Sequence, residues 1–236
     1  MANENMTIRF TPDGFSFAEC PNSASILLDD APFHEVAPGS DFQQRLHEQV
    51  LEQVASDNDV RDITCQLVST RVLTLPTEVT EPDMARQMYG LTLGQADSEE
   101  EVLLQDVVLP SGQAVRLCFG IDHELYHFLM RNFGDVTFEH HLSTLLEQGA
   151  RMASGNCMVV RCDSQFLELA LFRQGKLDMT NVYRVSQADN RTYYIMNAWI
   201  QHKLDQLQDN LLVLSQNTEG LQVRASLHRF IKHVFG

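Results

Sequence analysis

The sequence predicts an α/β protein with a mixed β-sheet in each of two halves. A strand–strand–strand–helix–strand order (β-β-β-α-β) occurs twice along the 236 residues, and 44% of the residues are hydrophobic. Three strands that lead into a helix, which returns a further strand to the same sheet, place α and β elements in layers. A chain of this length is long enough to bury a core in each half.

The first copy of the pattern lies near the start of the sequence. Asp13-Gly14 predicts the first hairpin turn, and Ser40 with Gln43 predicts the capping box of a helix whose apolar residues lie four apart on one face. The predicted strands are Ile8–Phe10, Phe15–Cys20, Ser25–Leu28 and, after the helix, Ile63–Val68; the predicted apolar face of the helix is Phe42, Leu46, Val50 and Val54.

The second copy repeats this order in the last third of the chain. Turns are predicted at Asp163-Ser164 and Gln174-Gly175, and Ser186 with Asp189 predicts a helix start. The predicted strands are Cys157–Cys162, Phe166–Phe172, Leu177–Val182 and Leu211–Leu214; the predicted apolar face of the helix is Tyr193, Met196, Ile200, Leu204 and Leu207, with Trp199 beside it. A last helix is predicted over Ala225–Phe235, because Leu227, Phe230, Ile231 and Val234 recur at helical spacing.

Further elements separate the two copies. The predicted ones are a helix after Pro82, a solvated loop over 97–101, strands Val102–Leu109 and Val115–Phe119, helix Asp122–Asn132, strand Val136–Phe138 and helix Leu142–Met152. The net charge is −17 up to residue 153 and +2 from residue 154 onward. With the turn-prone Ser154-Gly155-Asn156, this asymmetry predicts a domain 1–153, which carries an inserted segment of about 76–112, and a shorter domain 154–236.

The composition argues against several classes of function. A net charge of −15 with only three lysines argues against binding the phosphate backbone of nucleic acid. The first residues lack the basic and apolar regions of a signal peptide, and no apolar run approaches the roughly 20 residues that span a bilayer, so we expect a cytoplasmic protein without membrane insertion. The five cysteines form no C-x-x-C pair, and reduced core thiols are expected.

The order of elements and several segments resemble a known family. The repeated unit is similar to the ribonuclease H-like fold that is duplicated in actin, sugar kinases and the pilus-assembly actin-like proteins. An uncharacterised actin-like family of Bacteroides and its relatives is the more specific likeness, carried by Ser69–Pro76, Phe133, His140–Ser143, Leu171–Leu177, Asn181, Asp189 and Tyr193–Asn197. The resemblance implies two ribonuclease H-like domains of the actin-like ATPase fold, and it implies no particular reaction.

The phosphate-binding turns that the resemblance implies are weakened in this chain. Actin-like ATPases hold phosphate in two hairpin turns, where small residues let backbone N–H groups approach and a carboxylate orients Mg²⁺ or water. In the first hairpin, Pro12 stands two residues before Gly14, where an Asp is expected, and the second hairpin has Asp163 and Ser164 but no Gly. The turn expected to contact adenosine reads 215–217, Ser-Gln-Asn, instead of a Gly-rich sequence. The candidate cofactor-binding residues are therefore Asp13, Gly14, Asp163 and Ser164, and no catalytic residue is assigned.

One motif suggests a different chemistry. His123-Glu124-x-x-His127 matches H-E-x-x-H, which places two imidazoles on one helical face around Zn²⁺ with the Glu as general base, and Glu147 is at a separation compatible with a third ligand. Three points oppose the site. Asp122 as N-cap places His123 in the first turn of the helix, and Arg131 adds a cation to the helical face that carries the two histidines. The opposite face of the helix is apolar and expected to be buried, which turns the histidines toward solvent; its residues are Leu125, Phe128, Leu129 and Phe133. Surface histidines are expected here and at His140-His141, and no metal ligand is assigned.

The leading interpretation is a catalytically degenerate actin-like protein that acts as a binding or scaffold module, with no cofactor. A weak ATP-binding protein or ATPase that uses ATP and Mg²⁺ is the alternative, and a zinc hydrolase is the second alternative. A protein partner or self-association is expected, because the short second half should leave a sheet edge exposed for pairing with another strand.

Overall fold

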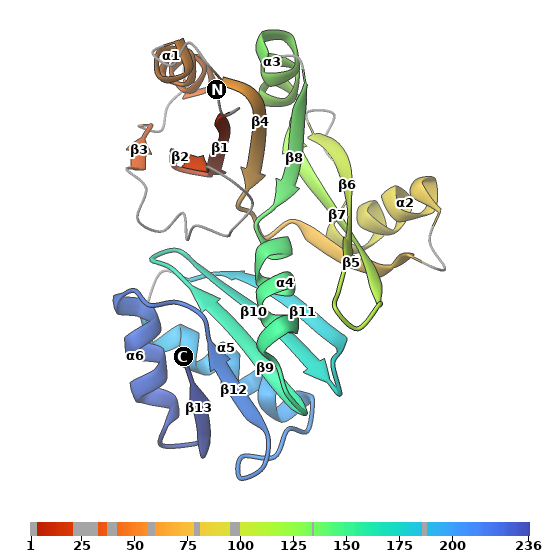
Figure 1. Cartoon of the computed structure of the whole chain (residues 1–236), viewed down its shortest axis with the longest axis vertical. Coiled ribbons are helices and arrows are strands. Elements are labelled where there is room, and N and C mark those ends of the chain that lie inside the picture. The colour runs from red at the N-terminus through yellow and green to blue at the C-terminus, as the bar shows by residue number, and fades with distance from the viewer. Residues whose placement is uncertain are drawn as a thin grey trace. The chain divides into compact units, whose positions relative to one another are not determined.

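A computed structural model describes residues 4–20, 33–36, 42–55, 60–77, 81–94, 100–133, 135–185 and 188–236. The chain divides into two compact units. Unit 1 comprises residues 1–75, 79–105 and 116–141, and unit 2 comprises 76–78, 106–115 and 142–236. The domain boundary that the sequence predicts after residue 153 stays a prediction. Figure 1 shows the elements of both units.

Unit 1 is built on a five-stranded mixed sheet in the order β3-β2-β1-β4-β8. β1 and β2 form an antiparallel hairpin, and β4 and β8 continue the sheet in parallel with β1. Helices α1 and α3 contact each other, and α3 also contacts β8 (Figure 1). The bounds are β1 Glu4–Thr11, β2 Gly14–Cys20, β3 Phe33–Glu35, α1 Phe42–Ala55, β4 Val60–Leu67, α3 His123–Phe133 and β8 Val136–His140.

Unit 2 has a five-stranded sheet with the equivalent order, β11-β10-β9-β12-β13. β9, β10 and β11 form an antiparallel meander, and β12 and β13 continue in parallel with β9. The bounds are α4 Leu142–Met152, β9 Asn156–Cys162, β10 Phe166–Arg173, β11 Lys176–Arg184, α5 Ala188–Gln201, β12 Asn210–Val213, α6 Thr218–Leu227 and β13 His233–Phe235. The β-β-β-α-β order that the sequence predicts is thus present in both units.

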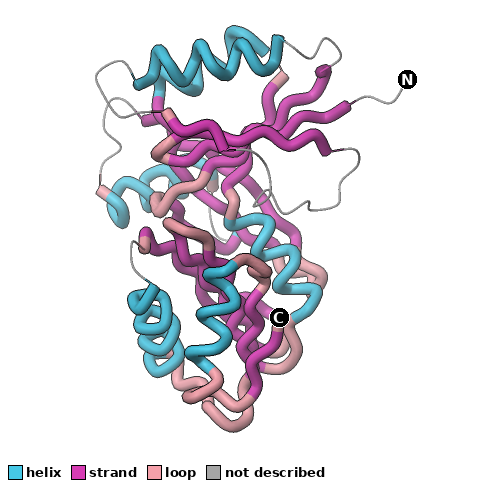
Figure 2. The backbone as a smooth tube through the Cα atoms, turned by 90° about the vertical axis from the view of Figure 1, so that its left-hand side faces the viewer, coloured by secondary structure: helices cyan, strands magenta, loops and turns pink. Residues whose placement is uncertain are grey.

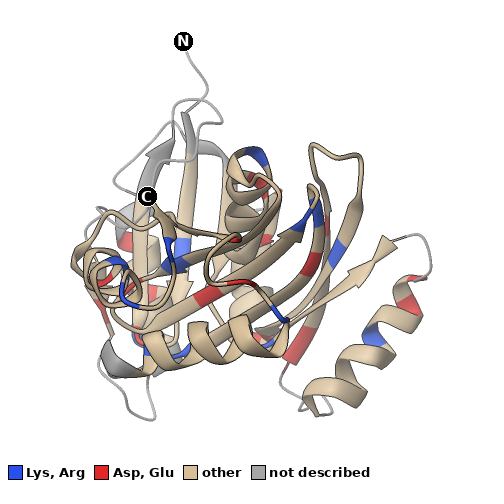
Figure 3. Ribbon diagram, turned by 90° about the horizontal axis from the view of Figure 1, so that it is seen from below, with Lys and Arg blue, Asp and Glu red and all other residues tan. Residues whose placement is uncertain are grey.

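A third, three-stranded sheet has the order β5-β7-β6. Its strands are β5 Val72–Pro76, β6 Glu100–Val108 and β7 Ala114–Asp122, and the connection from β5 to β6 contains α2 Pro82–Leu93. Buried Tyr89 and Ala85 of α2 pack with Leu75 and Cys118 of this sheet. Figure 3 shows charged residues of both signs along α2, where Arg86 and Asp83 form an ion pair of 3.4 Å. The helix predicted after Pro82 is confirmed.

The core of unit 2 lies on both faces of its sheet. All residues of β10 from Phe166 to Phe172 are buried, which explains why all of them except Glu168 are apolar. Leu167, Leu169 and Leu171 share a cluster with residues of α5, whereas Gly149 of α4 packs so closely on Phe172 that a Cβ there would lie 3.1 Å from the ring. Figure 2 shows helices on either side of these strands.

The buried face of α5 corrects the sequence prediction. Ile195, Ala198 and Trp199 are buried, whereas Tyr193 is 65% and Ile200 is 67% exposed. The helix ends at Gln201, so Leu204 and Leu207 lie beyond it. The end is a Schellman motif: the N–H of Leu204 donates to the carbonyl of Trp199, and that of Lys203, at a φ of 54°, donates to the carbonyl of Ile200.

The end of the chain also differs from the prediction. The last helix is α6, Thr218–Leu227, and it is followed by the strand β13, His233–Phe235, where a helix was expected over Ala225–Phe235. Asn217 caps α6 by accepting a hydrogen bond from the Gly220 N–H. Leu227 ends the helix, and the turn that follows it buries Ile231 as well. Val234 belongs to the next strand, where it pairs with β12. Apolar residues at helical spacing therefore do not mark one continuous helix here.

Three further predictions fall partly or wholly outside the described residues. The strand predicted at Ser25–Leu28 lies there, and the third strand of the sheet is Phe33–Glu35. The capping residues Ser40 and Ser186 also lie outside the described residues. Within α1, Leu46 and Val50 are buried as predicted.

Candidate functional site

The first hairpin turn joins β1 to β2 and is closed by its own atoms. The Thr11 hydroxyl donates to the Gly14 carbonyl at 3.3 Å and accepts from the Asp13 N–H at 3.4 Å. The Asp13 carbonyl accepts from the N–H of Val36, just beyond β3. Gly14 has a φ of +154°, and a Cβ there would lie 2.1 Å from the His34 carbonyl oxygen. The glycine is therefore required for the close approach of β3 to β2.

The second hairpin turn joins β9 to β10 and is an Asx turn. Asp163 Oδ1 accepts from the backbone N–H groups of Gln165 and Phe166 at 2.8 and 2.7 Å. On the other side of the turn, the guanidinium of Arg191 in α5 donates to the carbonyls of Asp163 and Ser164 at 2.6 and 2.9 Å. Arg191 is only 4% exposed. Its contact with this turn was not predicted, and a buried Arg beside an Asp-Ser turn carries no local sequence signal.

The third turn follows β12 and leads into α6. Ser215 is fully buried, and its hydroxyl accepts from the Cys162 N–H at 2.7 Å, which ties the turn to β9. The Asn217 side chain donates to the Cys162 carbonyl at 2.9 Å and accepts from Gly220. A Cβ at Gly220 would lie 2.2 Å from the Ser215 carbonyl oxygen. Gly220 thus allows a tight strand-to-helix turn, and the prediction for residues 215–217 missed it.

The H-E-x-x-H motif occupies the first turns of α3. Asp122 is the N-cap, because its Oδ1 accepts from the Leu125 N–H at 2.9 Å. Leu125, Phe128 and Leu129 are buried and Phe133 is partly buried, as predicted. The His123 and His127 side chains are 46% and 44% exposed. The surface position of these two histidines is confirmed.

The structure adds a partner to the two histidines that the sequence did not suggest. Glu101 of β6 places Oε1 2.7 Å from His123 Nδ1 and 4.0 Å from His127 Nε2. No other group of three or more His, Cys, Asp or Glu side chains with this ligand-like spacing occurs in the described part of the chain. The hairpin β6–β7 brings Glu101 to the start of α3. A prediction that these two strands pair could have indicated that Glu101 lies next to His123.

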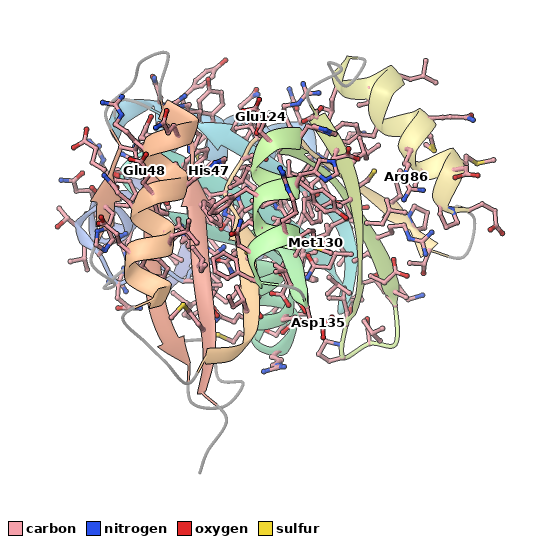
Figure 4. The ribbon with its side chains drawn as sticks, turned by 90° about the horizontal axis from the view of Figure 1, so that it is seen from above. His47, Glu48, Arg86, Glu124, Met130 and Asp135 are labelled. Atoms are coloured by element: carbon pink, nitrogen blue, oxygen red, sulfur yellow. The ribbon has the colours of Figure 1, made fainter. Side chains whose placement is uncertain are left out.

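Glu124, the motif's expected general base, lies elsewhere. It lines an open groove of about 430 Å³ together with His47 of α1 and Phe128, Arg131 and Asn132 of α3. Figure 4 shows Glu124 on α3 and His47 on the neighbouring helix α1. Arg131 also lines this groove while its Nε donates to the His127 carbonyl. The expected third ligand, Glu147, belongs to α4 of unit 2.

Burial tunes one titratable group in this groove. The His47 ring stacks on Phe128 with centroids 3.9 Å apart. Desolvation lowers the pKa of His47 below its ordinary value of 6.5, against the opposing effects of Glu124 and Asp122, which raise it. The neutral imidazole is therefore the favoured form in the folded protein.

The His140-His141 pair corrects another prediction. Both residues were expected on the surface, but they are 0% and 1% exposed. His140 Nε2 lies 3.2 Å from the Ser69 carbonyl oxygen, and the His140 ring lies 5.4 Å from the Phe119 ring. β8 ends at His140 in the parallel ladder with β4, which draws the pair into the interior. These histidines have a structural role.

The cysteines of the described core are reduced and not activated. Cys65, Cys118, Cys157 and Cys162 are free and buried, as predicted. Burial raises the pKa of the thiols of Cys118, Cys157 and Cys162 to about 11, and it raises that of Cys65 further. A thiol with a raised pKa is a poor nucleophile at neutral pH.

Comparison with known proteins identifies the family. The family model described as "Protein of unknown function (DUF3822)" matches residues 1–234. The chain belongs to this family. The DUF3822 protein is similar to a solved protein of Bacteroides thetaiotaomicron with an actin-like ATPase fold and unknown function, at 22% identity, with 99% of this chain and 90% of that chain covered and a TM-score of 0.75. The predicted Bacteroides-type family and its fold are thereby confirmed.

A second solved structure supports the same fold. It is a type IV pilus biogenesis complex of PilM and PilN, with 12% identity, coverage of 99% of this chain and 86% of that chain, and a TM-score of 0.54. No curated protein matches this chain. None of the described helices is both long and apolar enough to cross a membrane. The DUF3822 protein thus has the actin-like ATPase fold, and its function is not established by these relatives.

Proposed function

We propose that this DUF3822 protein is a catalytically degenerate actin-like protein that acts as a binding or scaffold module and does not hydrolyse nucleotides. The observation that carries the proposal is the hydrogen bonding of its two hairpin turns. In each turn, backbone N–H groups that an actin-like ATPase would direct at phosphate are taken up by side chains of the turn itself.

The second turn supports the proposal most strongly. The Asp163 carboxylate would have to orient Mg²⁺ or water, but its Oδ1 accepts two short backbone hydrogen bonds. Hydrogen bonds to a charged acceptor contribute about 1.5–3 kcal/mol each, and ordering the carboxylate around a metal ion would compete with them. The Gln165 and Phe166 N–H groups cannot bind a phosphate at the same time, because they already donate to Asp163 Oδ1.

The first turn supports the same conclusion by a different route. Pro12 has no backbone N–H to offer, and the Asp13 N–H is directed at Thr11. Gly14, the residue best suited to a phosphate turn, lies so close to His34 that its missing side chain is explained by strand packing. Each of the candidate residues Asp13, Gly14, Asp163 and Ser164 therefore has a structural role in a turn.

Two observations support a binding role. A solved chain that shares the fold belongs to a complex of PilM and PilN. In unit 2 the described sheet ends at β11 on one side and at β13 on the other. Outer strands present backbone groups that can pair with a strand of another chain. Gln113 already hydrogen-bonds to both the N–H and the carbonyl of Leu177, at the start of β11, which protects that end of the edge.

Thermal unfolding with Mg-ATP tests the proposal against the ATP-binding alternative. A ligand at 100 times its Kd stabilises a protein by about 2.7 kcal/mol, which raises the Tm of a chain of this size by about 5–10 °C. We expect no shift at millimolar Mg-ATP beyond that produced by Mg²⁺ alone. A shift of several degrees that Asp163→Ala abolishes would establish the ATP-binding alternative and overturn the proposal.

Sedimentation velocity tests the self-association form of the binding role. We expect the average mass to rise with protein concentration if β13 pairs with a second copy. A Val234→Pro substitution at the edge should then reduce the association. A monomer at all concentrations would restrict the binding role to a different partner protein.

A further inference from the structure

The residues Glu101, His123 and His127 are placed together by the backbone. β6 and β7 are neighbours in the three-stranded sheet and are joined by a short turn, so the start of β6 lies opposite the end of β7. β7 continues directly into α3 at His123. His123 and His127 are four residues apart on this helix and share one face. The β6–β7 hairpin therefore brings Glu101, near the start of β6, next to both histidines.

The first turn of α3 is held firmly enough to present His123. The Asp122 cap fixes the turn through the Leu125 N–H, and Leu125 itself is buried. The His123 and His127 rings contact each other with centroids 4.2 Å apart, and Tyr126 lies against His127 at 5.3 Å. The first-turn position of His123, which at the level of the sequence counted against a metal site, is thus stabilised by the cap and by buried Leu125.

The three side chains offer ligand atoms at a spacing suited to a metal ion. His123 Nδ1, His127 Nε2 and Glu101 Oε1 all lie within 4.8 Å of one another. Ligand atoms 2.0–2.2 Å from a tetrahedral Zn²⁺ are about 3.3–3.6 Å apart. The separations of 2.7 and 4.0 Å from Glu101 Oε1 lie on either side of this spacing, so small side-chain rotations bring all three atoms into place.

The chemistry of the donor set favours a transition-metal ion such as Zn²⁺ over Mg²⁺ or Ca²⁺. Two imidazoles and one carboxylate form the set found in several zinc sites, whereas Mg²⁺ and Ca²⁺ prefer sites built from oxygen atoms alone. The partial exposure of all three side chains, between 40% and 46%, leaves room for water at the remaining positions. The Arg131 side chain lines the groove with His47 and Glu124, and its Nε donates to the His127 carbonyl.

We propose that Glu101, His123 and His127 form a binding site for a divalent transition-metal ion, Zn²⁺ by its ligand set, that joins strand β6 to helix α3. Glu124 lines the separate α1–α3 groove, so the site lacks the general base that an H-E-x-x-H hydrolase places beside its metal. The site would thus bind an ion and link β6 to α3 without catalysing hydrolysis. Its existence does not depend on the binding role proposed for the sheet edges of unit 2. The expectation of no metal ligand was reached without Glu101.

Calorimetric titration with ZnCl₂ tests the proposal. The full chain is purified without a histidine tag, stripped with a chelator and kept reduced. We expect one Zn²⁺ per chain, and we expect Glu101→Gln and His127→Ala each to weaken binding at least about tenfold. Addition of Co²⁺ in place of Zn²⁺ should give the visible absorption of a site with nitrogen and oxygen ligands, and His127→Ala should lose it.

Two matched variants serve as controls. Glu124→Gln changes the middle of the motif without touching the three ligands, and it should leave Zn²⁺ affinity unchanged. His202 Nδ1 lies 3.8 Å from Asp178 Oδ2 in unit 2, so His202→Ala removes a histidine–carboxylate pair that lacks a third ligand and should also leave affinity unchanged. Thermal unfolding of each stripped variant verifies that it is folded. No saturable binding up to about 100 µM Zn²⁺, or wild-type affinity in His127→Ala, would overturn the proposal.

Discussion

The two units share one sheet design and differ in what is attached to it. The order β3-β2-β1-β4-β8 in unit 1 corresponds strand for strand to β11-β10-β9-β12-β13 in unit 2. Between its last two strands, unit 2 has only α6, whereas unit 1 has β5, α2, β6, β7 and α3. The extra hairpin supplies Glu101, so the candidate metal site exists only where the repeat was elaborated. The five-stranded sheet common to both units therefore accounts for the architecture, and the segment found only in unit 1 carries the candidate metal site.

The largest expected change in the free energy of unfolding comes from truncating core residues of α5 and α1, the helices at equivalent positions in the two units. Trp199 of α5 is fully buried, and truncating it to alanine should lower the free energy of unfolding by about 3–5 kcal/mol. Leu46→Ala in α1 should cost about 2–4 kcal/mol. Urea unfolding followed by circular dichroism measures both. The matched control is Ile200→Ala, whose side chain is 67% exposed and which should change stability by less than about 0.5 kcal/mol. A large effect at Ile200 would restore the apolar face predicted from the sequence.

The next largest difference is expected in the stability lost when an ion pair is broken in each unit. Glu168 and Arg161 are cross-strand partners on β10 and β9 and are hydrogen-bonded, with side chains 3% and 11% exposed. Glu168→Gln leaves a buried cation and should cost about 3–5 kcal/mol.

The counterpart in unit 1 is the bidentate pair of Arg71 with Glu100, at 2.8 and 2.9 Å, in which the Arg71 side chain is 41% exposed. Tyr89 also donates to Glu100, and burial raises the pKa of its hydroxyl, so it remains a donor. Glu100→Gln should cost about 1–2 kcal/mol in the same urea experiment, because water screens Arg71. Equal losses in Glu100→Gln and Glu168→Gln would contradict the assigned role of burial.

The two hairpin turns give a smaller contrast. Asp163→Ala removes two short hydrogen bonds to backbone N–H groups and should cost about 1–2 kcal/mol. Thr11→Val removes two longer contacts, of 3.3 and 3.4 Å, and should cost about 0.5 kcal/mol. Differential scanning calorimetry of the two variants provides the comparison. If Asp163→Ala leaves the Tm unchanged, the carboxylate is not needed to close the turn and becomes available for Mg²⁺.

The smallest expected effect is a pH dependence confined to unit 1's helix pair. α1 meets α3 through His47 and Phe128, whereas Thr192 of α5 hydrogen-bonds to Ser226 of α6, and neither of those residues titrates. Because the pKa of His47 is lowered in the fold, the unfolded chain takes up the proton first. The stability from this group is present above pH 6.5 and is lost as the pH falls from 6.5 through the folded pKa.

His47→Gln should therefore reduce the loss of stability between about pH 8 and about pH 5.5, whereas Thr192→Val should not change it. Urea unfolding at a series of pH values measures the slope for each variant. Identical slopes for the wild type and His47→Gln would show that the groove does not favour the neutral imidazole.

Much of the fold could be predicted because its signals are local. The largely apolar run of β10, the hairpin turn just before Gly14 and the Asp122 cap each depend on neighbours within a few residues, and each lies within a residue or so of where the sequence indicated. The predicted apolar face of α5 and the predicted bounds of the last helix were wrong. An apolar residue at helical spacing can be buried from a turn or a strand as well as from a helix, as Leu204 and Ile231 show.

The sequence by itself determined the α/β class and the twofold repetition of β-β-β-α-β, because turn residues, capping residues and hydrophobic periodicity act along the chain; its motifs also indicated the family that the comparison confirmed. Only the tertiary structure decided that Arg191 lies behind the Asp163-Ser164 turn, and that Glu101 rather than Glu124 or Glu147 faces His123 in unit 1. These contacts depend on which strands pair and where each side chain points after pairing. A linear sequence does not specify the distance between residues that lie more than twenty positions apart, and the sheet does.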